Sequence, residues 1–221
     1  MSRFEHKFPH GRATWLREQV LAAIAEAYDE NCRRYAEEIG DNATTFGVTL
    51  FHNICFFLEQ RLEGVGGVEI RRPSNAFVIE IDGYFLHVYK APPGAATMHA
   101  MRFDQSDVRL ELVRENTDQL SLEFIEESAP IDEPRHLVVV HFGDPIDGLE
   151  RVEVGAPIAS GVNGFAWAWS EVLSDQPVER QAEDEGAPVE HDEPKAVPDF
   201  GLTLIDTQAE ERDEMQGGDA S

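Results

Sequence analysis

Lysine is the residue this chain most conspicuously lacks. Only Lys7, Lys90 and Lys195 occur in 221 residues, and the 18 basic residues face 43 acidic ones, for a net charge of −25. Phosphate backbones and anionic lipid surfaces bind to clustered basic side chains. The composition therefore argues against direct nucleic-acid binding and against adsorption to a membrane. A basic protein is the kind of partner that this charge favours. The simpler explanation of the charge is that surplus acid keeps the protein soluble.

Cysteine and long apolar runs are scarce as well. Cys32 and Cys55 have no CxxC spacing and lie in apolar helical patterns, which predicts buried free thiols and neither a disulfide nor a metal site. No run is long enough to span a bilayer, and the opening MSRFEHKFPHGR has no apolar leader core. We therefore expect a cytoplasmic protein with no membrane contact and no cofactor.

The N-terminal third has the period of helices. Residues 1–13 show no pattern and are predicted to be a flexible N-terminus. Apolar residues then recur every three or four positions over 14–39, ahead of Gly40, and again from candidate caps at 41–45 to Leu62. The second segment is apolar on most sides, which is typical of a helix buried between layers; a homodimer face is the alternative.

Beyond the glycines at 64–67 the period changes to two. Asp82-Gly83 is a strong hairpin signal within residues 75–90, and its register puts six apolar side chains on one face: Phe77, Ile79, Ile81, Tyr84, Leu86 and Val88. Alternation favours two more strands across 108–112 and 120–124, although Ser106 is equally suited to cap a short helix ending near Arg114. Further strands are predicted at 136–142, 151–157 and 165–173.

This order of elements predicts an α+β fold, with two N-terminal helices packed on a mainly antiparallel β-sheet. We predict a single domain over 14–173. Residues 174–221 are predicted to be an acidic disordered tail, because from Asp175 onward 15 acidic residues face three basic ones and large apolar residues are few. A short apolar segment at 198–206 interrupts the tail.

Catalytic motifs are absent. The sequence has no HExxH, no GxSxG and no metal-binding cysteine pair. A small metal-dependent hydrolase would have to draw its site from scattered residues, of which His87, His136, His141 and Asp144 are the best candidates. Their spacing specifies no geometry, so each is more simply read as structural.

Our leading hypothesis is accordingly a non-enzymatic protein-interaction or regulatory protein of the inhibitor, immunity or adaptor type. Three places have apolar character suited to a partner: the second helix, the second face of the 75–90 hairpin, with Val78, Phe85, His87 and Tyr89, and the tail segment, with Phe200, Leu202, Leu204 and Ile205. The tail segment has a strand-like alternation and is as well suited to pair with the protein's own sheet edge as with a partner. An acidic mimic of nucleic acid is the third hypothesis.

Overall fold

The structure is a computed structural model, and it describes residues 2–9, 11–73, 76–103, 106–122, 134–160 and 164–174. The chain divides into two units, Met1–Arg180 and Gln181–Ser221, and all described residues belong to the first. The predicted tail over 174–221 therefore lies outside the described residues apart from Ser174. None of the described helices is long and apolar enough to cross a membrane.

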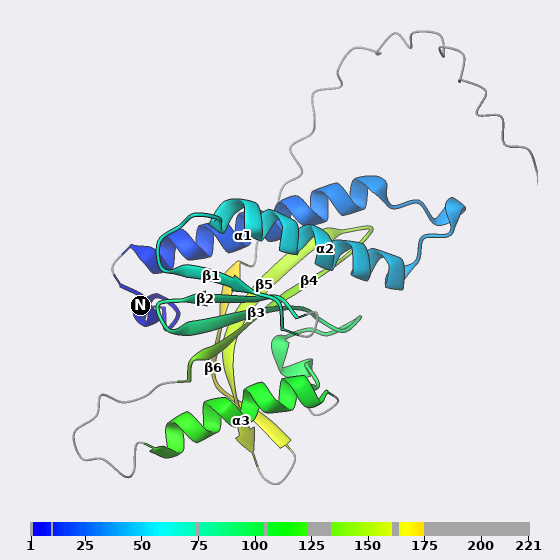
Figure 1. The fold of residues 1–221 in the computed structure, drawn as a ribbon. Coiled ribbons are helices and arrows are strands. Elements are labelled where there is room, and N and C mark those ends of the chain that lie inside the picture. Colours follow the sequence, from blue (N-terminus) through cyan, green and yellow to red (C-terminus); the bar gives the residue numbers. More distant parts are fainter. Residues whose placement is uncertain are drawn as a thin grey trace, which may run out of the picture. The chain divides into compact units, whose positions relative to one another are not determined.

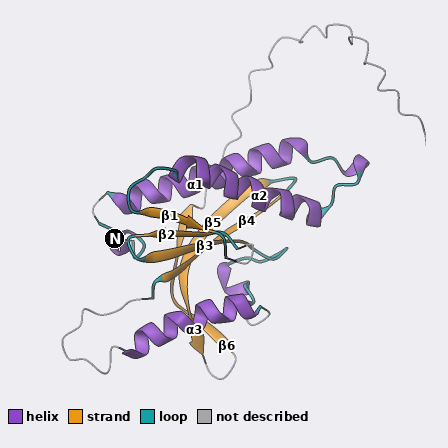
Figure 2. Cartoon of the chain, viewed as in Figure 1, coloured by secondary structure: helices purple, strands orange, loops and turns teal. Residues whose placement is uncertain are grey.

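The predicted α+β class is confirmed. A six-stranded sheet in the order β1-β2-β3-β4-β5-β6 is antiparallel throughout except where β3 pairs with β4. Helices α1 and α2 cover one face of this sheet, and α3 covers the other (Figures 1 and 2). The elements are α1 (Arg12–Arg34), α2 (Ala43–Leu62), β1 (Val68–Arg71), β2 (Val78–Ile81), β3 (Tyr84–Lys90), α3 (Asp107–Leu122), β4 (His136–Asp144), β5 (Gly148–Ser160) and β6 (Gly164–Ser174).

The first residues are packed, which corrects the prediction of a flexible N-terminus. Phe4 and Phe8 flank the short 3-10 helix η1 (Glu5–Lys7), and both rings are buried in the core beneath α1. The backbone N–H groups of Arg3 and Phe4 donate to the carboxylate of Glu171 on β6, at 2.8 and 3.0 Å. Two aromatic anchors and a carboxylate in β6 thus hold a segment that has no periodic pattern of its own.

The two predicted N-terminal helices form, with local signals marking their ends. The α1 helix stops at Arg34, and a 3-10 turn, η2 (Glu37–Ile39), leads to Gly40 in the left-handed conformation at φ 104°. Asn42 then caps α2: its side chain accepts from the N–H groups of Thr44 and Thr45, while the Thr45 hydroxyl accepts from the Asn42 N–H. This reciprocal capping box satisfies backbone donors that a helix start leaves unpaired.

The predicted hairpin is confirmed in turn and register. Asp82 and Gly83 both have positive φ, as a two-residue turn of this kind requires, and Ile81 pairs with Tyr84 and Ile79 with Leu86. The face predicted to be apolar packs under α1 and α2 within the larger core cluster. Strands also form at the three later predicted positions, and all three are longer than predicted.

Residues 107–122 form helix α3, so the strands that we favoured at 108–112 and 120–124 are wrong for the described residues. Leu112, Val113 and Asn116 are buried on its inner face. The Asn116 side chain donates to the carbonyl oxygens of His136 and Pro157 and accepts from the His136 N–H, at 2.8–2.9 Å. A buried polar residue thus occupies one position of the inward-facing side of the helix. A pattern that counts apolar residues alone does not detect such a helix.

The sheet consequently has two cores. The larger one lies between the sheet and α1, α2 and η1. The smaller one lies on the opposite face, where Met98, Met101 and Phe103 from the β3–α3 connection pack with α3 against Val138 and Val140. We predicted the first core and not the second, because α3 was read as strands.

Two glycine substitutions should change the stability of the fold in opposite directions. Gly143 has φ 153°, and a Cβ there would clash with the Gly148 carbonyl and lie 2.7 Å from Cε1 of Tyr28. Gly47 lies inside α2 with nothing within 4 Å of an added Cβ. We expect Gly143→Ala to lower the free energy of unfolding by about 3 kcal/mol and Gly47→Ala to raise it by about 0.5–1 kcal/mol. Urea unfolding measures both, and equal midpoints for the two variants would contradict this account of the packing.

Candidate functional site

The four residues proposed for a hydrolase do not come together. His136 and His141 lie five residues apart on β4, so their side chains point to opposite faces of the sheet. His87 on β3 joins His136 on the α3 face, whereas His141 is buried in the core beneath α1. Asp144 ends β4. The sheet itself therefore separates the set into two.

His87 and His136 form a hydrogen-bonded chain with Glu115 of α3. Nε2 of His87 lies 3.1 Å from Nδ1 of His136, and Nε2 of His136 lies 2.8 Å from a Glu115 carboxylate oxygen. Burial lowers the pKa of His87 to about 3, helped by its neighbour His136, and burial lowers that of His136 to about 4. Two neutral rings, each carrying its proton on Nε2, account for both bonds: His87 donates to His136, and His136 donates to Glu115. It joins α3 to the sheet as a structural network.

His141 has a partner in the first core. Its Nδ1 lies 3.0 Å from the hydroxyl of Tyr28, and the two rings meet edge to face. Burial lowers the pKa of His141 to about 3, and the positive charge of Lys90 adds to this effect. Burial also raises the pKa of Tyr28. A neutral histidine bonded to a neutral phenol is a satisfied core pair and offers no group to a substrate.

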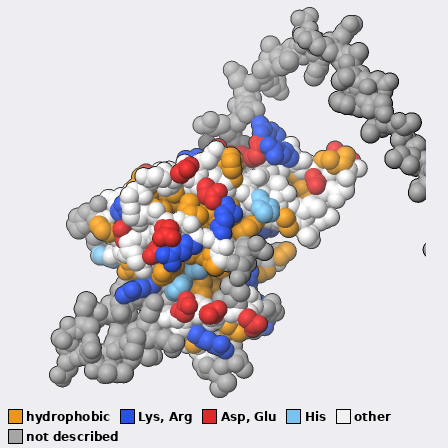
Figure 3. All heavy atoms as spheres, viewed as in Figure 1, with side chains coloured by type: hydrophobic (Ala, Val, Ile, Leu, Met, Phe, Trp, Pro, Cys, Tyr) orange, Lys and Arg blue, Asp and Glu red, His pale blue; other side chains and the backbone are white. Residues whose placement is uncertain are grey.

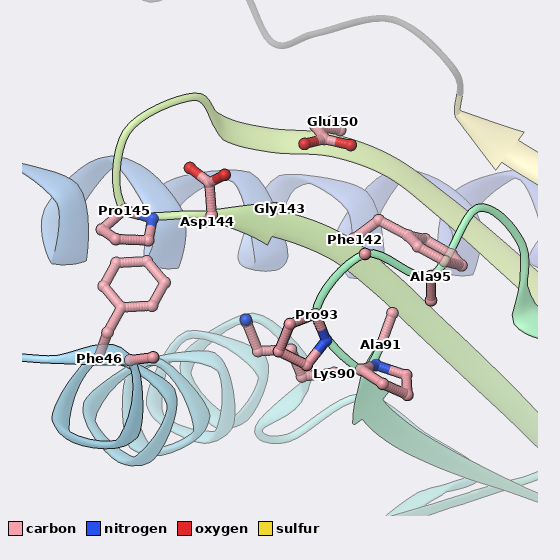
Figure 4. Close-up of a pocket in the computed structure, with 13 residues that line it drawn as sticks. Phe46, Lys90, Ala91, Pro93, Ala95, Phe142, Gly143, Asp144, Pro145 and Glu150 are labelled. Atoms are coloured by element: carbon pink, nitrogen blue, oxygen red, sulfur yellow. The ribbon is translucent and has the colours of Figure 1, made fainter. Parts of the chain in front are cut away.

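A cavity of about 420 Å³ opens where β3 and β4 end (Figure 4). Its walls come from the first turn of α2, the loop after β3, the end of β4 and the start of β5. None of the candidate histidines lines it, although Asp144 does. The lining residues are Ala43, Phe46, Lys90, Ala91, Pro92, Pro93, Gly94, Ala95, Phe142, Gly143, Asp144, Pro145 and Glu150.

Lys90 is the residue of this cavity that sequence reasoning missed. Its side chain is half-buried, and its ammonium lies 5.8 Å from the centre of the Phe46 ring. The ammonium makes no hydrogen bond or ion pair with the described part of the chain. Burial lowers the pKa of Lys90, and Asp144 acts in the opposite direction. A lysine two residues ahead of Pro-Pro-Gly, in a chain so poor in lysine, is the signal that could have drawn attention to it.

Carboxylates gather at the rim of the same cavity. Oxygens of Asp144, Asp147 and Glu150 lie within 4.8 Å of one another, the spacing of ligands around a metal ion. Oδ1 of Asp144 already accepts from the N–H groups of Ile146 and Asp147, both at 2.7 Å. Exposed acidic groups often gather at turns in this way, so the cluster by itself does not identify a metal centre.

The hairpin face proposed for a partner is covered in the structure. Phe85 stacks on His136, His87 is held in the histidine chain, and Tyr89 lies beneath Arg109 of α3, 4.7 Å from its guanidinium. These three residues are at most half exposed. The tail residues Phe200, Leu202, Leu204 and Ile205 lie outside the described residues.

The outer side of α2 carries three large exposed apolar side chains. Val48, Phe51 and Phe56 are 55%, 37% and 52% exposed, and we call these three residues the α2 face. Figure 3 shows apolar side chains reaching the surface over α2 beside a histidine. Residues 43–58 include no Asp, Glu, Lys or Arg. The breadth of the apolar pattern in this helix therefore has two causes: one side of the helix packs in the core, and the other side exposes apolar side chains to solvent.

Comparison with known proteins adds no relative: no family model, no curated protein and no solved structure matches this chain.

Acid should destabilise the fold through its neutral histidines. Because the folded pKa of His141 is about 3 and an unfolded histidine titrates near 6.5, stability is complete above pH 6.5 and falls as the pH drops toward 3. Between pH 6.5 and 4.5 this residue should account for about 2 kcal/mol of lost unfolding free energy.

His141→Gln should therefore lose less stability over that interval than the parent chain, although it starts lower at pH 7.5 because the bond to Tyr28 changes. Urea unfolding at pH 7.5, 6.5, 5.5 and 4.5 tests this, with the exposed His52→Gln as the matched control. Parallel pH profiles for the parent and His141→Gln would show that His141 is not protected from protonation.

Proposed function

We propose that this protein is a non-enzymatic interaction protein that binds another protein through the α2 face. The observation that carries this proposal is the exposure of Val48, Phe51 and Phe56 on the part of α2, residues 43–58, that carries no charged side chain. Covering the exposed part of each side chain would contribute about 1 kcal/mol to the free energy of binding. Together the three contributions are enough for a binding hot spot when polar contacts surround these residues. The satisfied histidines support the same proposal, since their hydrogen bonds serve the fold.

The charge around the α2 face supports a partner with an apolar groove and a basic rim. Carboxylates lie around the C-terminal end of α2: Glu59 in its last turn, Glu63 just after it, and Glu26 of α1, which pairs with Arg61. Several of them already pair with arginines, as Glu26 does with Arg61 and Glu59 with Arg72. The rest of a net charge of −25 would steer a basic partner and make association slower at high salt. A second copy of this acidic chain is the less favoured occupant.

Substitution of the α2 face should abolish binding while the fold stays intact. We expect Val48→Glu with Phe56→Glu to weaken partner binding at least a hundredfold, because two charges would be buried in an apolar contact. Unfolding free energy should change by less than about 0.5 kcal/mol, since both side chains are exposed. Val172→Glu, at the 51% exposed Val172 of β6, is the matched control.

The partner can be found with a photo-crosslinking amino acid placed at position 56 and, as a control, at position 172. The proposal predicts a defined adduct from position 56 only, and the purified partner then provides a dissociation constant for the parent chain and each variant. Sedimentation of the purified protein separates the self-associated case. A partner that binds the double Glu variant as tightly as the parent would refute the role of the α2 face.

The tail segment at 198–206 stays a proposed second contact. A chain ending at Ser174 should retain α2-face binding, and it should lose affinity only to the extent that Phe200, Leu202, Leu204 and Ile205 also touch the partner. Calorimetry on the full and shortened chains measures the difference. If the shortened chain binds the partner more tightly than the full chain does, the tail segment competes with the partner for a surface of this protein.

We also propose that this binding takes place in the cytoplasm. Cys32 and Cys55 form no disulfide with each other in the structure, which fits a reducing compartment. Cell fractionation followed by detection of the protein tests the proposal.

A further inference from the structure

The cavity at the ends of β3 and β4 places opposite charges at its walls without pairing them. Asp144 is near enough to raise the pKa of Lys90, yet the two side chains form no ion pair. In Figure 4 the Lys90 ammonium lies beside Phe46, whereas the carboxylates of Asp144 and Glu150 lie toward the other rim. A ligand that carries both charges would meet complementary groups at both places.

Neighbouring structure holds the backbone of Lys90 and the carboxylate of Asp144 in place. Lys90 ends β3, where it pairs in register with His141 of β4, and the Ala91 N–H donates to the His141 carbonyl oxygen at 2.9 Å. Two backbone N–H groups hold Oδ1 of Asp144, which fixes the carboxylate and leaves Oδ2 for a ligand. Sites that are ordered before binding lose less free energy when a small molecule is captured.

The rest of the lining is apolar and stiff. Phe46 and Phe142 are each 3% exposed, Pro92 and Pro93 have no N–H to offer, and Ala91 and Ala95 complete the wall. A volume of about 420 Å³ falls in the range of small-molecule sites. Apolar walls beside an ammonium and two carboxylates suit a ligand that has a short hydrocarbon side chain as well as both charges.

We propose that this cavity binds a small zwitterion with an apolar side chain, of the class of free aliphatic α-amino acids. The ligand carboxylate would lie at Lys90 and the ligand ammonium at Asp144 and Glu150, while its side chain would contact Phe46 and the two prolines. A divalent cation suits this cavity less well, because the Lys90 ammonium would repel it. The proposal does not depend on the α2 face.

Three probes with the same hydrocarbon side chain test the proposal on the intact chain: L-leucine, 4-methylpentanoate, which lacks the ammonium, and 3-methylbutylamine, which lacks the carboxylate. We expect saturable binding of leucine by calorimetry, and at least tenfold weaker binding of each single-charge probe. Amide resonances of Ala91, Gly94 and Ala95 should shift with leucine. Equal affinity of 4-methylpentanoate and leucine, or no binding of any probe, would overturn the proposal.

Variants test the two charged groups separately. Lys90→Met keeps most of the stem and should weaken leucine binding at least tenfold, as should Asp144→Asn, whose amide oxygen can still accept from the turn. Lys7→Met is the control, because Lys7 lies over Trp169 and does not line the cavity. If Lys90→Met instead leaves leucine binding unchanged and strengthens Mg²⁺ or Ca²⁺ binding, the cavity is a cation site and the proposal fails.

Discussion

The parallel pairing of β3 with β4 is the constraint on which the candidate site depends. Two parallel strands end at the same edge of a sheet, so Lys90 at the end of β3 lies beside His141, three residues before the end of β4. Parallel strands also cannot be joined by a tight turn, and the connection must cross over a face of the sheet. That connection supplies both the loop at 91–95, which walls the cavity, and α3, which covers the second core. One parallel pair in an antiparallel sheet thus generates both features.

The pleat of β4 determines what its histidines do. Residues five apart on a strand face opposite sides, so His136 meets α3 while His141 meets Tyr28. On each side the ring is desolvated and its hydrogen bond is supplied by the protein. This separation could have been predicted from the sequence, because the strand at 136–142 was recognised and its period is two. The pairing of His87 with His136 could not, since it needs the register of strands 49 residues apart.

Local signals predicted most of the first core and little of the second. The Asp82-Gly83 turn and the caps around Asn42 act within a few residues, and both behave as their side chains require. Helix α3 was predicted only as the alternative to two strands, and too short, because Asn116 fills its buried face with hydrogen bonds to β4 and β5, contacts that exist only after the sheet forms. The N-terminus was missed for the same reason: Phe4 and Phe8 are ordered by a core built from residues far along the chain.

The contrast between the histidines and Lys90 explains why the cavity is the better candidate for a ligand. A buried polar group that has its hydrogen bonds already gains little from a ligand, which would have to break them first. His87, His136 and His141 are in that position. Lys90 has lost part of its hydration and, among the residues that the structure describes, its ammonium gains only the face of Phe46 in return, while Asp144 stands too far away to pair. A ligand anion would restore what burial removed, so the free energy of binding is available at Lys90 and not at the histidines.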